Sequence, residues 1–239
     1  MTPNPRSGHR TPTEGEKSSV PPSHTHIRKT VEAYLAHHPA ERDALADLLA
    51  ALDQPDDATS RTTLPGHVTC SAVVIDRNCN VLHIRHRLTG LLLVPGGHLE
   101  HTDRSLLAAA LRELEEEAGI PAGALTLTPQ CLGSPIDVDV HEIDANPERS
   151  EPPHRHYDLR YAFYLADELP PQLVLQDEEV AGAQWLPIAS MTSPTLRAKL
   201  MDAGLDGRQE PVNASALIHN AQGLCTLGQC PGSCTVRGC

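Results

Sequence analysis

Apolar residues recur at helical spacing in two short stretches near the N-terminus, namely Ile27, Val31, Tyr34 and Leu35, and then Leu45, Leu48, Leu49 and Leu52. A period of three to four residues is typical of an amphipathic helix that buries one face. Pro39 separates the stretches and suits the first position of the second helix, where its missing N–H costs nothing. We therefore expect a short helical segment over residues 26–56.

From His67 the pattern changes to the alternation of a strand, with Val68, Cys70, Ala72 and Val74 on one face and His67, Thr69 and Ser71 on the other. Further strands are expected near 81–87, 91–94, 127–132, 136–141, 155–165 and 182–187, and the one at 91–94 should be short and buried. Helices are expected over about 104–118 and from Ser193-Pro194 to about Gly204. This order predicts an α/β fold over residues 64–205, with a mixed sheet covered on both faces.

The two faces of the strand expected at 155–165 differ in chemistry. Tyr157, Leu159, Tyr161 and Phe163 share one face, which is either directed to the core or forms a wall on which a base could stack. His154, His156, Asp158 and Arg160 share the opposite face, which either reaches a phosphate or ribose or is solvated.

The two ends of the chain have compositions typical of disorder. Residues 1–25 contain five prolines among Ser, Thr, Gly and His, and cannot bury enough apolar surface to offset the entropy of ordering. Residues 206–239 carry four cysteines, Cys225, Cys230, Cys234 and Cys239, whose spacing differs from paired C-x2-C zinc knuckles. We expect a disordered tail there, with a zinc site as the alternative.

Charge and hydropathy limit the partners. The formal charge is -12, and no basic run could follow a nucleic-acid backbone, so duplex binding is not expected. No stretch is long and apolar enough to span a membrane, and residues 1–25 have only Met1 and Val20 as large apolar side chains. We expect a cytoplasmic protein without a signal peptide.

The helix expected at 104–118 combines an apolar stripe with a charged face. Leu107, Leu111, Leu114 and Ala118 form the stripe, while Arg112, Glu113, Glu116 and Glu117 project from the other side. A run of glutamates is usually a solvated face. Here four carboxylates lie within five residues, and the i, i+4 pair Glu113 and Glu117 repels, so the cluster favours a bound cation. The preceding Gly96-Gly97 allows close backbone approach and offers carbonyls.

Residues 97–120 resemble the signature of the Nudix hydrolase family, G-x5-E-x7-R-E-U-x-E-E-x-G-U, in which U is an apolar aliphatic residue. The second half matches at every fixed position, at Arg112, Glu113, Leu114, Glu116, Glu117, Gly119 and Ile120. In the first half, Asp103 replaces the glutamate, and eight residues rather than seven separate it from Arg112. Asp103 is therefore either an equivalent of that glutamate or an N-cap of the helix.

The resemblance implies an α/β/α sandwich with a mixed sheet, and hydrolysis of a diphosphate bond in a nucleoside diphosphate linked to another moiety X. It implies Mg²⁺ or Mn²⁺ as cofactor, held by Gly97, Glu113, Glu116 and Glu117. Glu113 could instead orient water, and Arg112 would hold a carboxylate in place, so Arg112, Glu113 and Glu116 are the expected catalytic residues. A general base from outside the helix could be Glu178 or Glu179, although an acidic surface loop is the simpler explanation of these residues.

Three functional classes fit this resemblance. The first is the metal-dependent hydrolase, with a small nucleotide-type substrate. The second is a non-catalytic, ligand-sensing Nudix module, which a retained metal helix disfavours. The third is an isomerase of prenyl diphosphates, whose active-site cysteine motif has no convincing counterpart here. The sequence leaves the oligomeric state open, with a homodimer among the alternatives.

Overall fold

A mixed, eight-stranded sheet forms the centre of the part of the chain that the computed structural model describes, residues 21–147, 150–167 and 171–207. Its strands are β1 (Gly66–Ile75), β2 (Asn80–His86), β3 (Leu92–Leu93), β4 (Gly96–His98), β5 (Leu125–Leu127), β6 (Asp137–Ile143), β7 (His154–Leu165) and β8 (Val180–Pro187). The two long strands β1 and β7 run parallel over their shared length, from Gly66 opposite Arg155 to Ile75 opposite Tyr164. All the other pairings are antiparallel.

The neighbours of the central pair change along its length. At the start of β1 and β7 the flanking strands are β4 and β6, whereas β2 and β5 flank its end. β2 continues the sheet by pairing with β3 and β8. The end flanked by β4 and β6 therefore brings together four strands, β1, β4, β6 and β7, from distant parts of the sequence.

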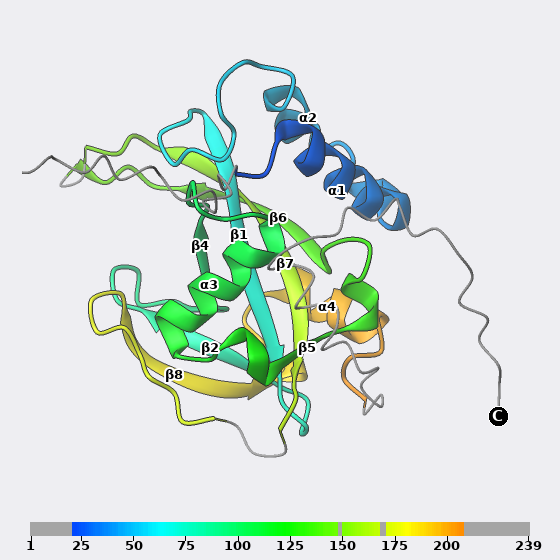
Figure 1. Cartoon of the computed structure of the whole chain (residues 1–239), viewed down its shortest axis with the longest axis vertical. Coiled ribbons are helices and arrows are strands. Elements are labelled where there is room, and N and C mark those ends of the chain that lie inside the picture. Colours follow the sequence, from blue (N-terminus) through cyan, green and yellow to red (C-terminus); the bar gives the residue numbers. More distant parts are fainter. Residues whose placement is uncertain (1–20, 148–149, 168–170, 208–239) are drawn as a thin grey trace, which may run out of the picture.

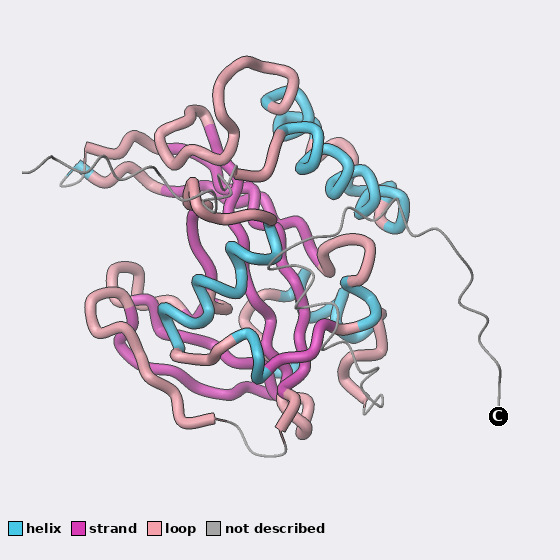
Figure 2. The backbone as a smooth tube through the Cα atoms, viewed as in Figure 1, coloured by secondary structure: helices cyan, strands magenta, loops and turns pink. Residues whose placement is uncertain are grey.

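Four helices surround the sheet: α1 (His24–His37), α2 (Ala46–Ala51), α3 (Leu106–Ala118) and α4 (Pro194–Asp202). α3 packs across β1, as Figures 1 and 2 show. The Ser105 side chain caps its N-terminus by accepting a hydrogen bond from the Ala108 N–H, and Gly119 ends it in the left-handed conformation that glycine adopts without strain. None of the helices among the described residues combines the length and apolarity needed to cross a membrane.

The core confirms one of the two interpretations of β7. Tyr157, Leu159, Tyr161 and Phe163 are all buried and belong to the hydrophobic core, so this face packs inside the protein and offers no wall to a base. β1 is buried at all ten positions, on both faces, as expected for a strand in the middle of a covered sheet.

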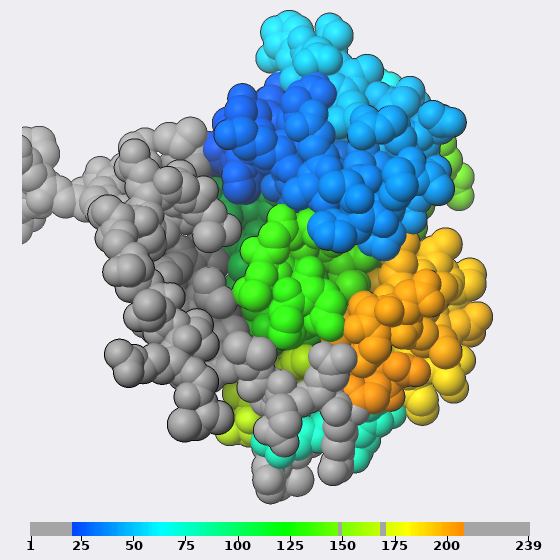
Figure 3. Space-filling view, turned by 90° about the vertical axis from the view of Figure 1, so that its right-hand side faces the viewer, coloured from blue at the N-terminus to red at the C-terminus, as the bar shows by residue number. Residues whose placement is uncertain are grey.

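The N-terminal helices are part of the folded body. Figure 3 shows them (blue) beside α4 (orange) on one face of the molecule. Ile27, Val31 and Tyr34 are fully buried. The Lys199 ammonium of α4 forms an ion pair with Glu41 at 2.9 Å, and also binds Asp137 of β6 and the Tyr34 hydroxyl. Polar contacts thus join the N-terminal segment to both α4 and the sheet.

Several predicted elements differ in detail. Pro39 begins a separate 3₁₀ turn, Pro39–Glu41, rather than the helix α2, which starts at Ala46. The strand predicted at 91–94 is not buried, because β3 pairs only with β2 at the sheet edge and Leu93 is 42% exposed. β4 was not predicted at all.

The predicted disordered ends fall mostly outside the described residues, which omit 1–20 and 208–239. The inner boundaries shift, however. Ser23 caps α1, which begins at His24, and Leu205 is fully buried. The helical segment therefore begins slightly before the predicted residue 26, and burial continues up to the predicted limit of residue 205. The four-cysteine tail lies outside the described residues.

Candidate active site

A cavity of about 580 Å³ opens between α3, β4 and the β6/β7 side of the sheet. Three kinds of side chain line it: the carboxylates Glu113, Glu116 and Glu117, the polar row His154, His156, Asp158 and Arg160, and the apolar groups Leu88, Leu92, Leu93, Met191 and Leu196. The polar row is therefore not a solvated sheet face, since Asp158 is only 4% exposed. It forms a wall of the cavity.

Arg112 connects the loop before α3 to the glutamates on the helix. Its Nη1 donates to Glu113 Oε1 at 3.0 Å and to Glu116 Oε2 at 2.8 Å, while its Nη2 donates to the His98 carbonyl at 2.8 Å. The side chain is thereby fixed at both ends of its guanidinium fork. A planar group with this many partners holds the carboxylates around it in defined positions.

Asp103 is the remaining partner of Arg112. Its two carboxylate oxygens accept from Arg112 Nε at 3.1 Å and from Arg112 Nη2 at 3.0 Å, and Oδ2 also accepts from the Glu100 N–H at 2.7 Å. Since Ser105 caps α3, Asp103 does not act as the N-cap. The structure thus excludes the N-cap alternative, and the buried, bidentate pair shows that Asp103 holds Arg112.

Glu117 is buried although it carries an ionisable group. Its side chain accepts a hydrogen bond from the Gly96 N–H at 2.9 Å, and it forms no ion pair within the described part of the chain. Burial raises its pKa to about 8, more than the Gly96 hydrogen bond lowers it. A buried carboxylate without a cationic partner is costly, and a bound divalent cation would compensate it.

Glu113 lies against the backbone of Gly97. A Cβ placed at Gly97 would meet the Glu113 carboxylate at 2.7 to 2.8 Å, so the absence of a side chain is what lets the strand approach the helix. Burial raises the pKa of Glu113 to about 7, although Arg112 acts in the opposite direction. Two adjacent turns of α3 therefore present carboxylates of raised pKa to the glycine strand β4.

Glu116 differs from the other two glutamates. Its side chain is 49% exposed and is paired with Arg112. Of the two proposed bases, Glu179 lines the cavity, whereas Glu178 does not. The sequence analysis singled out seven site residues, and all of them except Glu178 line this cavity: Gly97, Arg112, Glu113, Glu116, Glu117 and Glu179.

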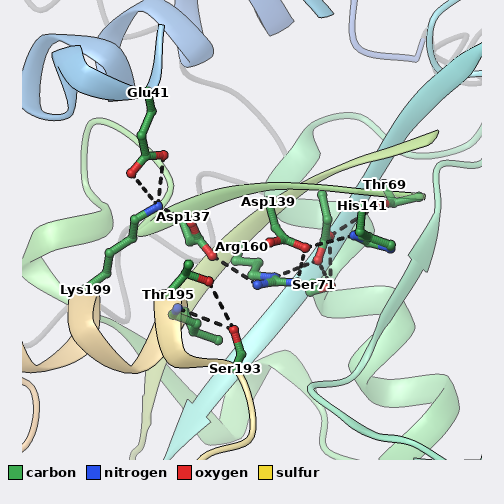
Figure 4. Close-up of polar contacts among 12 residues, drawn as sticks. Glu41, Thr69, Ser71, Asp137, Asp139, His141, Arg160, Ser193, Thr195 and Lys199 are labelled. Atoms are coloured by element: carbon green, nitrogen blue, oxygen red, sulfur yellow. Dashed lines mark hydrogen bonds and ion pairs between the residues drawn. The ribbon is translucent and has the colours of Figure 1, made fainter. Parts of the chain in front are cut away.

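Sequence reasoning missed the ion network beneath the polar row, which Figure 4 shows. Arg160 is almost fully enclosed and pairs with Asp137 at 3.0 Å, Asp139 at 2.9 Å and Asp158 at 2.8 Å. Asp158 in turn accepts from the Ser71 hydroxyl at 2.8 Å. The alternation of polar residues along β7 was visible in the sequence, but the partners come from β1 and β6, and only the strand register identifies them.

The sequence also did not predict a cluster of histidines. His67, His154 and His156 each offer a ring nitrogen, and these three atoms lie within 4.8 Å of one another. Among the described residues, these three histidines have side-chain ligand atoms close enough together to hold one metal ion, whereas the glutamates of α3 do not form such a group.

Comparisons with known proteins found curated relatives of part of the chain. A probable DHNTP pyrophosphohydrolase of Lactococcus lactis subsp. cremoris is 32% identical over 101 residues, which is 42% of this chain and 55% of that protein. The uncharacterized Nudix hydrolase NudL of Escherichia coli is 48% identical over 44 residues, 18% of this chain and 22% of that protein. The matched segments thus span about half of the first relative and less than a quarter of the second.

Solved structures with a similar fold include a C. elegans Ap4A hydrolase binary complex, with a TM-score of 0.44, 19% identity, and coverage of 57% of this chain and 98% of that chain. The E. coli dihydroneopterin triphosphate pyrophosphohydrolase gives a TM-score of 0.43 at 20% identity, covering 56% of this chain and 92% of that chain. The NUDIX domain model matches residues 65–204, more than half of the sequence and the whole region from β1 to α4. With the carboxylate helix α3 inside that match, the chain belongs to the Nudix family.

Proposed function

We propose that this protein is a pyrophosphohydrolase that cleaves a phosphoanhydride bond in a nucleoside diphosphate linked to another moiety, with Mg²⁺ or Mn²⁺ as cofactor. The observation that carries the proposal is Glu117, a buried carboxylate that faces the Gly96 N–H and has no cationic partner among the described residues. The membership in the Nudix family and the naming of a relative as a probable pyrophosphohydrolase support it.

The residues that fit a divalent cation are Glu113, Glu116, Glu117 and the Gly97 carbonyl. Oxygen ligands of this kind suit Mg²⁺, which keeps several waters and binds few protein groups. When bound, the cation would neutralise phosphate charge and lower the pKa of a bound water. Arg112 holds Glu113 and Glu116 from the side, and Asp103 holds Arg112, so the role of these two residues is to fix the carboxylates in place.

The remaining cavity fits a small nucleotide-type substrate. Its volume of about 580 Å³ lies in the range of roughly 300–1,000 Å³ typical of small-molecule sites. The apolar side, with Leu92, Leu93 and Met191, could cover a base or another flat apolar group, while the glutamate side would hold the cation that neutralises the phosphates. Glu179, on the cavity wall, is our candidate for the residue that takes a proton from the attacking water.

The test is a hydrolysis screen of nucleoside diphosphate derivatives, nucleoside triphosphates and DHNTP, with Mg²⁺ or Mn²⁺ and with excess chelator. We expect at least one compound to be cleaved only when the cation is present. Glu117→Gln should lower kcat/KM by about 10²–10⁴, because it removes a charged ligand while its amide oxygen can still accept the Gly96 hydrogen bond. Glu115→Gln, at an exposed position of the same helix, is the matched control and should retain activity.

Two results would contradict the proposal. Hydrolysis that continues undiminished in chelator would exclude the metal role of α3. Specific binding of a nucleotide without any turnover, under every cation tested, would instead favour the ligand-sensing module.

A further inference from the structure

Five histidines meet at the end of the cavity where β4 and β6 flank the central strands. His67 of β1 lies directly opposite His156 of β7, and His156 lies opposite His141 of β6. His154 is two residues before His156 and shares its face. The ring centroids of His67 lie 5.0 Å from those of both His154 and His98, and 4.8 Å from that of His156. Four strands thus contribute imidazoles to one cluster.

Hydrogen bonds define where two of these rings carry their proton. His67 Nδ1 lies 3.1 Å from the Thr63 carbonyl, and His154 Nδ1 lies 2.9 Å from the Pro152 carbonyl. A carbonyl oxygen can only accept, so each Nδ1 must carry the hydrogen. In the neutral ring, Nε2 of His67 and Nε2 of His154 are then left with a free lone pair. A lone pair on one ring nitrogen, with the other nitrogen held by a carbonyl, is the arrangement that metal-binding histidines use.

His67 Nε2 has no hydrogen-bond partner within the described residues, although the atom is buried. His67 itself is 1% exposed. A buried nitrogen lone pair that accepts no hydrogen bond destabilises the fold, because the atom has lost its hydration without gaining a partner. Such unpaired atoms are rare in folded proteins. The His154 Nε2 atom, in turn, lies 3.2 Å from His156 Nε2. Ring nitrogens of His67, His154 and His156 therefore lie close together, and the hydrogen bond among them joins His154 to His156.

Burial affects the protonation of two of the rings, His67 and His156. It lowers the pKa of His67, and together with the neighbouring histidines it lowers the pKa of His156 to about 2. These two rings are therefore uncharged near neutral pH, which is the protonation state that coordinates a metal.

We propose that His67, His154 and His156 form a second divalent-metal site, for Zn²⁺ or a similar transition-metal ion, distinct from the carboxylate site on α3. Imidazole nitrogen is a preferred ligand of these ions, and three histidines leave a coordination position for water or a ligand oxygen. His154 and His156 also line the cavity, so such a ligand could enter from there.

The spacing fits a tetrahedral ion. With Zn–N bonds of about 2.0–2.1 Å, ligand nitrogens in a tetrahedron lie roughly 3.3–3.4 Å apart. His154 and His156 already have this separation, at 3.2 Å, and all three ligand atoms lie within 4.8 Å. His98 links the two sites, since its ring contacts His156 while its carbonyl accepts from Arg112.

The experiment uses the full chain with Cys225, Cys230, Cys234 and Cys239 replaced by serine, so that the tail cannot bind the ion. Excess Mg²⁺ fills the carboxylate site. The stripped protein is titrated with Co²⁺, which gives visible absorption bands in a tetrahedral nitrogen site, and the bound Co²⁺ is then displaced with Zn²⁺. We expect one ion per chain, with absorption that lacks the near-ultraviolet band of thiolate ligands.

Variants assign the ion to the histidines. His154→Gln and His156→Gln should each weaken Co²⁺ binding at least about tenfold. His83→Gln is the matched control, because His83 is also buried, lines the same cavity and places Nδ1 on a carbonyl two residues earlier, at 3.0 Å. It should bind Co²⁺ like the parent. Glu117→Gln should also retain the site, even though it impairs the carboxylate site.

Three outcomes would overturn the proposal: no Co²⁺ or Zn²⁺ bound by the parent, binding unchanged in both histidine variants, or binding lost in Glu117→Gln. Circular dichroism of each variant shows whether it folds, and His156, which is only partly buried, provides the informative variant if His154→Gln does not fold. Because the readout is metal binding, the result is independent of whether the protein proves to be a hydrolase.

Discussion

Among single residues, Glu117 links the site to the stability of the fold, because its buried carboxyl group has a raised pKa. The fold holds this carboxylate away from water, and its pKa is about 8 instead of the ordinary 4.5. The folded protein therefore binds this proton more tightly than the unfolded chain does. Between these two pKa values, the free energy of unfolding must fall as the pH rises, because unfolding releases a proton that the folded state still holds, and a rising pH favours that release.

We predict that Glu117→Gln removes this pH dependence. In metal-free protein, the free energy of unfolding of the variant minus that of the parent should increase between about pH 5 and pH 9, by on the order of 1–3 kcal/mol. Urea unfolding at several pH values measures it. Glu115→Gln on the exposed face of α3 serves as the control and should show a difference that does not change with pH. A difference between Glu117→Gln and the parent that does not change with pH would mean that water or an unrecognised group solvates the carboxylate.

At the level of secondary-structure elements, two residues at the N-terminus of α3 have different roles: one stabilises the helix and the other positions Arg112. Ser105 caps the helix, whereas Asp103 binds Arg112, and only two positions separate them in the sequence. Loss of a cap weakens a helix without moving side chains two turns away. Loss of Asp103 leaves the guanidinium of Arg112 with fewer partners and allows it to shift among the glutamates.

Substitutions at these two positions should consequently affect different properties. Ser105→Ala should lower the free energy of unfolding by about 0.5–2 kcal/mol and leave kcat and the Mg²⁺ requirement nearly unchanged. Asp103→Asn should lower kcat and weaken Mg²⁺ binding by about 10–100-fold, since it removes a charge that orients the ligand shell. Comparable losses of activity in both variants, after correction for the unfolded fraction, would contradict this division.

The close packing of β4 against α3 depends on the absence of a side chain at Gly97. Gly97→Ala would place a Cβ at 2.7 Å from the Glu113 carboxylate, so that either the strand or the glutamate must move. We expect a large loss of Mg²⁺-dependent activity and a smaller thermal shift on adding Mg²⁺. Gly182→Ala in β8 is the matched control, because nothing lies within 4 Å of its added Cβ. Equal effects of the two substitutions would show that the loss comes from strand glycines in general.

At the scale of the whole molecule, the N-terminal helices complete the domain. Tyr34, Glu41, Lys199 and Asp137 join α1 and the following turn to α4 and β6, and Arg160 continues the chain of charges to the cavity wall. The network in Figure 4 therefore extends from Glu41, close to α1, to the side of the sheet that faces the cavity. Removing the helices would expose the apolar core and one end of this network.

We predict that a chain of residues 21–207 folds and retains its activity, while residues 57–207 do not. The shorter chain loses the fully buried Ile27, Val31, Tyr34, Leu45 and Leu48. At roughly 1.5–3 kcal/mol per large buried side chain, this loss is comparable to the whole free energy of unfolding of an ordinary domain, about 5–15 kcal/mol. Thermal melts and activity of both chains test the prediction. A cooperative melt of residues 57–207 close to that of 21–207 would show that the helices are an appendage.

Features that depend on residues close together in the sequence could be predicted without the structure. The helical spacing, Ser105, and Gly119 define α3 locally, and the signature residues on it identified the family before the fold was known. The alternation along β7 likewise divided its residues between two faces. Such patterns are readable because the periods of helices and strands are fixed by the backbone.

The tertiary structure alone decided which distant residues meet. The short strand β4 has no apolar pattern, and it forms because its glycines fit between Ser71 and Glu113. Arg160 is neutralised by aspartates of β6 and β7, and His67 reaches His156 only through the parallel register of β1 and β7. Register between strands that lie far apart in sequence is set by packing of the whole sheet, and a shift of one residue would turn each of these side chains to the other face.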